Sequence, residues 1–230
     1  MQPFIKGRYT FLFVSLISLF ILNPFLPKRA VGLSILDIFI FAILLSTVFA
    51  VHENRKLFVA TLLLFFAAIG AFIAAYVTKM IFLGAISIGS YLVFFMTTGV
   101  IILKDVLKDE QVTIDKIFGA FCVFLFIGLI WAMAYSLLET LNPGSFNNLP
   151  GSPEDFRGYS VGGSPISVFV YYSYITLTTL GYGDITPATR AARSFASLEA
   201  IVGQMYLAVL VARLVGLHIA YSGRKDPNSG

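Results

Sequence analysis

The chain is a series of long, uninterrupted apolar runs separated by short polar segments. An α-helix rises about 1.5 Å per residue, so about 20 residues cross the hydrocarbon core of a bilayer, which is about 30 Å thick. Six runs have roughly that length: Tyr9 to Leu26, Ala30 to Val51, Leu57 to Val77, Met80 to Leu103, Ile117 to Leu138 and Ser194 to Leu217. We therefore predict an all-α membrane protein with six transmembrane helices.

A seventh apolar run, Ile166 to Leu180, is too short to cross. As a helix of roughly 15 residues it would extend only about 22 Å. It follows the segment Asn142 to Pro165, which is rich in turn-forming residues and is typical of an irregular loop. We predict an extracellular loop followed by a re-entrant helix.

Composition supports the membrane prediction, because 58% of the residues are hydrophobic, 12% are charged and the mean hydropathy is +0.87. The net charge is +4, but the sixteen Lys and Arg residues are scattered at the ends of the apolar runs. Such flanking charges are common in membrane proteins and form no basic patch. We therefore expect membrane lipid as a partner and no nucleic acid.

The basic residues also predict an orientation. Six spans place both termini on one side, and a cytoplasmic placement puts ten of the sixteen Lys and Arg residues inside and six outside. The positive-inside rule favours this arrangement, so we expect a protein of the plasma (inner) membrane with both termini in the cytoplasm. The first run resembles a signal peptide but has no small-x-small cleavage motif, and we expect it to be retained.

The segment Thr176 to Pro187, "TLTTLGYGDITP", places two glycines and several hydroxyls at membrane depth. Non-helical backbone is tolerated there only where protein buries it or water fills a cavity beside it. Gly181 and Gly183 can take φ values that a Cβ atom disfavours, which lets successive carbonyls face one side. A dehydrated potassium ion needs about eight oxygens, which four copies around an axis could supply. This predicts a cation site shared by four chains.

These residues resemble the selectivity filter of the tetrameric potassium channel superfamily, in its six-transmembrane, prokaryotic-type form with one pore loop per subunit. The resemblance covers about Ile117 to Leu217. It implies a homotetramer around a central pore, in which K⁺ is the permeant ion and no cofactor is needed. It also implies that K⁺ is bound by Thr179, Leu180, Gly181 and Tyr182, with Gly183 at the outer mouth.

Around this motif the sequence departs from the family in two places. Leu180 replaces the commoner valine, and Ile175 stands where some members carry a glutamate that bonds the filter aspartate. Tyr172, twelve residues before Asp184, matches an aromatic position of the family and could bond Asp184 instead. Thr178 is the remaining residue expected to support the filter.

The last apolar run also resembles the family. Gly203 lies nineteen residues after Asp184, at the spacing of a hinge glycine, although a glycine there could equally serve close helix packing. By the same resemblance Gln204 would line the cavity with Thr178 and Thr179. Ala208 and Val211 could narrow the cytoplasmic end.

These assignments divide the chain into four parts. Residues 1–103 would form a four-helix transmembrane bundle, 104–116 a cytoplasmic linker helix, 117–220 the pore domain and 221–230 a short cytoplasmic tail. The fourth helix of the bundle, Met80 to Leu103, contains no basic residue. A voltage sensor needs several arginines there, because each charge that crosses about 100 mV supplies only about 2.3 kcal/mol. We therefore expect no strong voltage dependence.

Three charged residues lie inside the predicted spans: Asp37, Glu199 and Arg213. Arg213 is expected to extend its side chain to the cytoplasmic interface. Glu199 could hold the pore helix through Tyr171, Tyr174 or Thr176, and Asp37 could accept hydrogen bonds from neighbouring hydroxyls. The single cysteine, Cys122, is expected to be a packing residue.

The main hypothesis is a potassium-selective channel that conducts passively. A weakly selective cation channel is an alternative, and a non-conducting membrane scaffold or regulatory subunit is another. An enzyme is not expected, because the sequence contains no metal-ligand cluster, no nucleophile with a plausible base and no phosphate loop.

Overall fold

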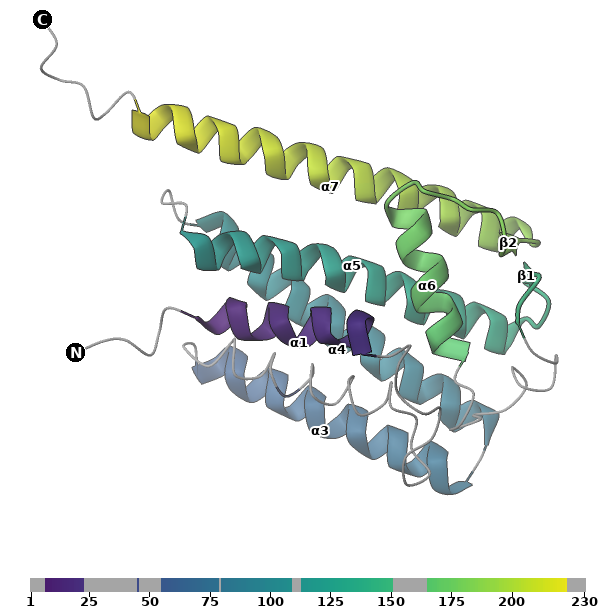
Figure 1. Cartoon of the computed structure of the whole chain (residues 1–230). Helices are drawn as coiled ribbons and strands as arrows, with labels where there is room; N and C mark the ends of the chain where they lie inside the picture. The colour runs from purple at the N-terminus through teal and green to yellow at the C-terminus, as the bar shows by residue number, and fades with distance from the viewer. Residues whose placement is uncertain are drawn as a thin grey trace, which may run out of the picture.

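A computed structural model gives the structure of the chain and describes residues 7–22, 45, 55–78, 80–108, 113–150 and 165–222. The described part is mostly helical (Figure 1). Its elements are α1 (Arg8–Leu22), α3 (Arg55–Thr78), α4 (Ile81–Lys108), α5 (Ile114–Leu141), β1 (Phe146–Asn147), α6 (Pro165–Leu177), β2 (Thr186–Pro187) and α7 (Arg190–Ser222). The predicted run Ala30 to Val51, with Asp37, lies outside the described residues except for position 45.

Four helices of the described residues are long and apolar enough to cross a membrane. They are Phe58–Thr78, Ile81–Lys108, Ile114–Leu141 and Arg190–Arg213, and they match four of the six predicted runs. Helix α1 begins at the first predicted run, and its apolar part, Tyr9–Ser18, is shorter than a span. The chain is therefore an integral membrane protein with four candidate spans in its described residues, and the total of six stays a prediction.

The predicted linker helix, 104–116, is only partly described, so this assignment stays a prediction. Helix α4 continues to Lys108 and α5 begins at Ile114, while residues 109–112 lie outside the described part. Where it is described, the segment 104–116 therefore consists of the ends of two long helices. Thr113 caps α5, because its side chain accepts the backbone N–H of Lys116 at 3.3 Å.

Helix α5 is the centre of the fold. It packs against α1, α4, α6 and α7, while α3 packs against α4 (Figure 1). The contact between α4 and α5 is aromatic, since the rings of Phe95 and Phe126 lie 5.4 Å apart and both side chains are fully buried. Cys122 is buried in α5, as expected of a packing residue.

A carboxylate of α5 bonds the first residues of α1. Asp115, in the first turn of α5, accepts the backbone N–H groups of Tyr9 at 3.1 Å and of Thr10 at 3.2 Å. The first amides of a helix have no partner within it and carry partial positive charge. Asp115 therefore fixes the start of α1 against α5.

The other end of α5 is joined to the segment that precedes α7. Glu139 accepts the backbone N–H of Gly144 at 2.7 Å and that of Phe146 at 3.2 Å, which shapes the turn after α5. Strand β1 then pairs antiparallel with β2, with Phe146 opposite Pro187. The start of α7 is thereby held beside the end of α5.

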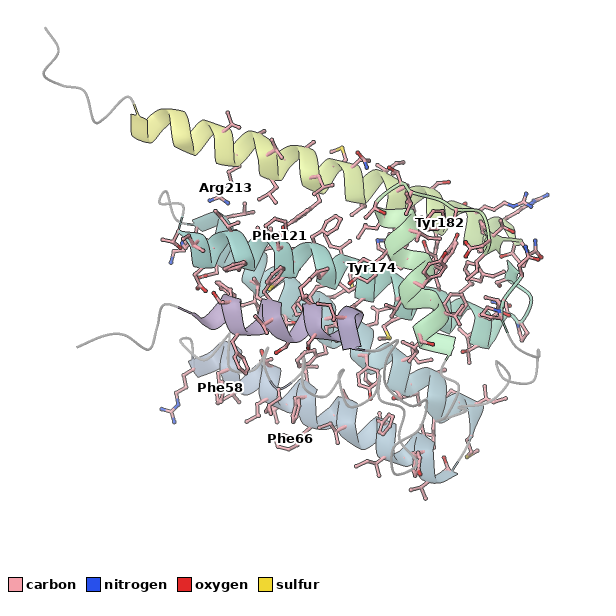
Figure 2. All side chains as sticks on the ribbon, viewed as in Figure 1. Phe58, Phe66, Phe121, Tyr174, Tyr182 and Arg213 are labelled. Atoms are coloured by element: carbon pink, nitrogen blue, oxygen red, sulfur yellow. The ribbon has the colours of Figure 1, made fainter. Side chains whose placement is uncertain are left out.

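Helix α6 crosses between α5 and α7 (Figure 1). Tyr174 of α6 lies where this helix meets α5 (Figure 2), and its hydroxyl donates to the Leu125 carbonyl. The tyrosine ring occupies the space above Gly128 of α5, where an added Cβ would lie 2.5 Å from Tyr174 Cε1. Gly128 is therefore the position that lets α6 approach α5.

This contact gives a first prediction. Gly128→Ala should lower stability by about 1–3 kcal/mol, because the methyl group overlaps the Tyr174 ring and the ring cannot move without losing its hydrogen bond. The measurement is the thermal unfolding midpoint of the purified protein in detergent. Gly89→Ala in α4 is the matched control, since nothing lies within 4 Å of the added Cβ. Equal effects of the two substitutions would contradict this account of the α5–α6 contact.

Candidate functional site

The segment between α6 and β2 contains Gly181 and Gly183, and the sign of φ alternates along its backbone. The φ angle is +59° at Thr179, +53° at Gly181 and +78° at Gly183, whereas Leu180 and Tyr182 have no positive φ. Positive φ is therefore present at every second residue from Thr179 to Gly183. Such a backbone can present successive carbonyl oxygens to one side.

Thr179 is the unexpected member of this alternation. A β-branched residue with positive φ is rare and costs on the order of 1–3 kcal/mol. Two backbone hydrogen bonds hold the strained segment against the end of α6. Thr179 N donates to the Thr176 carbonyl at 2.9 Å, and Gly181 N donates to the Ile175 carbonyl at 3.0 Å.

The side chains of this segment differ in their exposure and in their hydrogen-bond partners. Leu180 is 56% exposed and Tyr182 is 66% exposed in the single chain. The hydroxyl of Thr179 accepts from Gln204 Nε2 of α7 at 3.3 Å, so these two predicted site residues lie together. The Thr178 hydroxyl instead donates to the Tyr174 carbonyl at 2.6 Å, within its own turn.

Asp184 follows the alternating segment and is bonded by a tyrosine of α6. The hydroxyl of Tyr171 donates to Asp184 Oδ2 at 2.6 Å, whereas the sequence had suggested Tyr172. Tyr172 is buried instead, with its ring 5.1 Å from that of Tyr135 on α5. Adjacent residues of a helix point about 100° apart, so only one of the two tyrosines can reach Asp184. The Tyr171 hydroxyl holds the pKa of Asp184 below its ordinary value.

Comparison with known proteins identifies the region that contains this segment. A family model described as "Ion channel" matches residues 123–218. Protein LctB of Bacillus caldotenax is 31% identical over 106 residues, which cover 46% of this chain and 75% of that protein. The chain belongs to the ion channel family.

A second relative of this ion channel carries a more specific name. Two pore potassium channel c of Oryza sativa subsp. japonica is 30% identical over 112 residues, and the match covers 46% of this chain and 22% of the rice protein. These matches support membership of the potassium channel superfamily. No solved structure matches the chain.

In this ion channel, Gly203 of α7 is a contact residue. A Cβ at this position would overlap the carbonyl oxygen of Leu177, the last residue of α6. Helix α7 continues through Gly203 without interruption. The observed role is therefore close packing of α7 against the end of α6, and the hinge stays a prediction.

The other predicted residues of α7 differ in their surroundings. Gln204, Ala208 and Val211 are exposed in the single chain, and their place in a pore stays a prediction. Arg213 reaches from α7 to the last turn of α4, where its Nη2 donates to the Leu107 carbonyl at 2.7 Å (Figure 2). A cation is favoured there because the C-terminal end of a helix carries partial negative charge.

The partners of Glu199 differ from those expected. The sequence had suggested Tyr171, Tyr174 or Thr176, but the hydroxyls of Tyr135 and Ser173 bond this carboxyl group. The three suggested hydroxyls have other acceptors: Asp184 for Tyr171, the Leu125 carbonyl for Tyr174 and the Tyr172 carbonyl for Thr176. Tyr135 and Ser173 lie within apolar runs, so no local pattern distinguishes them.

The contact at Asp184 gives a second prediction. Tyr171→Phe removes the hydroxyl that lowers the pKa of Asp184, so that pKa should rise toward its ordinary value. A depressed pKa stabilises the folded state above the ordinary pKa, and this stabilisation is lost as the pH falls through the depressed value. Tyr171→Phe lacks this stabilisation, so its unfolding midpoint should lie below that of the unmodified protein at neutral pH, and the gap between the two midpoints should close as the pH falls through the depressed value. Tyr172→Phe is the control, and its midpoint should depend on pH in this range as that of the unmodified protein does.

Proposed function

We propose that this ion channel is a homotetramer that conducts potassium selectively and passively across the membrane. The observation that carries the proposal is the alternation of positive φ at Thr179, Gly181 and Gly183. In the proposed channel, K⁺ binds to carbonyl oxygens of Thr179, Leu180, Gly181 and Tyr182, which replace its water. Gly183 forms the outer mouth, and the name of the rice relative supports potassium as the ion.

The surface of the single chain supports assembly. One chain provides one row of carbonyls, whereas a dehydrated potassium ion needs about eight oxygens, which a ring of four chains supplies. Leu180 and Tyr182 expose apolar side chains beside that row. Within one chain only 11% of the apolar part of the span Arg190–Arg213 is buried. Most of this part of α7 can therefore contact other copies of the chain or lipid. A closed ring of four buries such surfaces.

The neighbouring helices have roles in the same proposal. Helix α6 is the pore helix, and its C-terminal end, which carries partial negative charge, faces the cavity below the filter. Helix α7 is the inner helix. Gln204 lies at the inner entrance, since it bonds Thr179, and Ala208 and Val211 line the path toward the cytoplasm.

Ion-flux measurements on protein in liposomes test this proposal against its alternatives. A potassium-selective channel gives barium-sensitive flux and a bi-ionic reversal potential that favours K⁺ over Na⁺. Barium-sensitive flux without a preference for K⁺ over Na⁺ would favour a weakly selective cation channel instead. No flux from correctly assembled protein would favour a scaffold or regulatory subunit.

A third prediction concerns the filter glycines. Gly183→Ala should abolish potassium flux and leave the tetramer intact, because alanine at φ +78° disturbs the carbonyl row. Gly144→Ala is the control: its φ is +86°, it also has nothing within 4 Å of an added Cβ, and it lies in the turn after α5. The control should conduct even if it is less stable. Normal potassium-selective flux through Gly183→Ala would exclude the assigned filter.

A fourth prediction concerns voltage. The basic residues of α4 are Lys104 and Lys108, which lie near its C-terminal end. Asp37, which lies outside the described residues, is the charged residue within the first four predicted spans. Even if this carboxylate crossed the whole membrane field in all four subunits, the electrical work would be only about 9 kcal/mol at about 100 mV. The conductance–voltage curve in symmetric potassium should therefore be shallow, with or without Asp37→Asn. A steep curve would require charges that move in the field.

A further inference from the structure

A buried carboxyl group lies where α5, α6 and α7 meet. Glu199 of α7 is fully buried, as are Tyr135 of α5 and Ser173 of α6. The hydroxyl of Tyr135 donates to Glu199 Oε2 at 2.5 Å, and Ser173 Oγ is within hydrogen-bonding distance of Glu199 Oε1. Ser173 Oγ also lies 2.7 Å from the carbonyl oxygen of Gly128. We call these three side chains the Glu199 cluster.

The hydrogen atoms of the cluster can be counted. Three oxygen–oxygen contacts need three hydrogens, but the hydroxyls of Tyr135 and Ser173 supply only two. The Gly128 carbonyl can only accept, so the single Ser173 hydrogen is used there. The contact between Ser173 Oγ and Glu199 Oε1 then lacks a hydrogen unless the carboxyl group provides one. A protonated Glu199 completes all three bonds, whereas a carboxylate leaves two oxygens facing each other unbonded.

Burial in the membrane favours the same conclusion. An unpaired carboxylate is costly inside a membrane-spanning helix. In the part of the chain that the structure describes, the groups bonded to Glu199 are hydroxyls, and no lysine or arginine pairs with it. A neutral acid avoids this cost and still satisfies both hydroxyls.

Glu139 provides a contrast within the same protein. It is also buried, with 4% of its surface exposed, but its two oxygens accept the backbone N–H groups of Gly144 and Phe146. An N–H group cannot accept a hydrogen bond, so both oxygens of Glu139 must act as acceptors. The two buried glutamates therefore have opposite hydrogen-bonding requirements.

We propose that Glu199 carries its proton at neutral pH and acts as a hydrogen-bond donor. Its proton goes to Ser173 Oγ, the Ser173 proton goes to the Gly128 carbonyl, and the Tyr135 hydroxyl bonds the other carboxyl oxygen. Glu199 is thereby a positioning residue that joins the inner helix to α6, whose end leads into the alternating segment. Its effect on conduction rests on the proposed function, whereas its protonation rests on the packing alone.

Paired substitutions test the proposal. The amide of Glu199→Gln keeps an acceptor for Tyr135 and a donor for Ser173, so its unfolding midpoint should stay unchanged and any ion flux should keep its selectivity. Glu139→Gln is the matched control. It places an amide N–H against a backbone N–H, and its midpoint should fall by about 2–10 °C. A fall at position 199 as large as that at position 139 would overturn the proposal.

Infrared difference spectra at neutral pH give a direct reading of the proton. Subtraction of the Glu199→Gln spectrum from that of the unmodified protein should reveal the carbonyl band of a protonated carboxylic acid. The same subtraction for Glu139→Gln should reveal carboxylate bands. Carboxylate bands at position 199 would refute the protonation. Neither the midpoint nor the spectrum requires conduction, so absence of flux in every variant would end the proposed function and leave this inference standing.

A further variant tests the positioning role. Ser173→Ala removes the hydroxyl that bonds both α5 and α7, so it should lower the midpoint and, in liposomes, reduce the preference for K⁺ over Na⁺. Ser197→Ala is its control, because Ser197 is exposed and its hydroxyl bonds the Arg193 carbonyl of its own helix. If Ser173→Ala assembled and conducted with unchanged stability and selectivity, Glu199 would have no positioning role through Ser173.

Discussion

A helix of thirteen residues cannot cross a bilayer, so α6 has to be held by contacts with protein. The same holds for the segment after α6, because backbone outside a helix finds no hydrogen-bond partners in lipid. Helices α5 and α7 provide these contacts. Tyr174 bonds a carbonyl of α5, Ser173 bonds α5 and approaches Glu199, and Gly203 lets α7 touch the last carbonyl of α6. The position of the glycine motif depends on these contacts.

Three charged residues of the long helices each have a partner on another helix. Glu199 has two hydroxyls, Arg213 has a carbonyl at the end of α4, and Asp115 has the first amides of α1. Such contacts satisfy groups that lipid would leave unbonded and also fix which helices lie together. Apolar packing alone is less selective, because lipid tails solvate leucine and isoleucine as well as a neighbouring helix does.

The two glutamates near the motif illustrate how the same side chain serves different partners. Glu139 shapes a turn through two backbone N–H groups, and Glu199 lies among hydroxyls that can donate or accept. A carboxyl group adapts to either environment by losing or keeping its proton. The surrounding donors and acceptors, and not the residue type, decide its chemistry.

The sequence by itself determined the membrane class and the candidate motif. Four predicted runs coincide with helices long enough to span, because the length of an apolar run is a local property that the bilayer thickness sets directly. Gly181 and Gly183 were also predicted from a local property, because the absence of a Cβ atom is visible in the sequence. Both have positive φ in the structure.

Only the tertiary structure decided which side chains meet. In the structure Asp184 is bonded by Tyr171 instead of Tyr172, and Glu199 is bonded to Tyr135 and Ser173. Thr179 has a positive φ. It also assigned Gly128 and Gly203 to close contacts with α6. These features depend on the rotation of each helix about its axis and on its distance from the next. In uniformly apolar runs no periodic pattern of polar residues encodes that rotation, so the contacts between helices fix it.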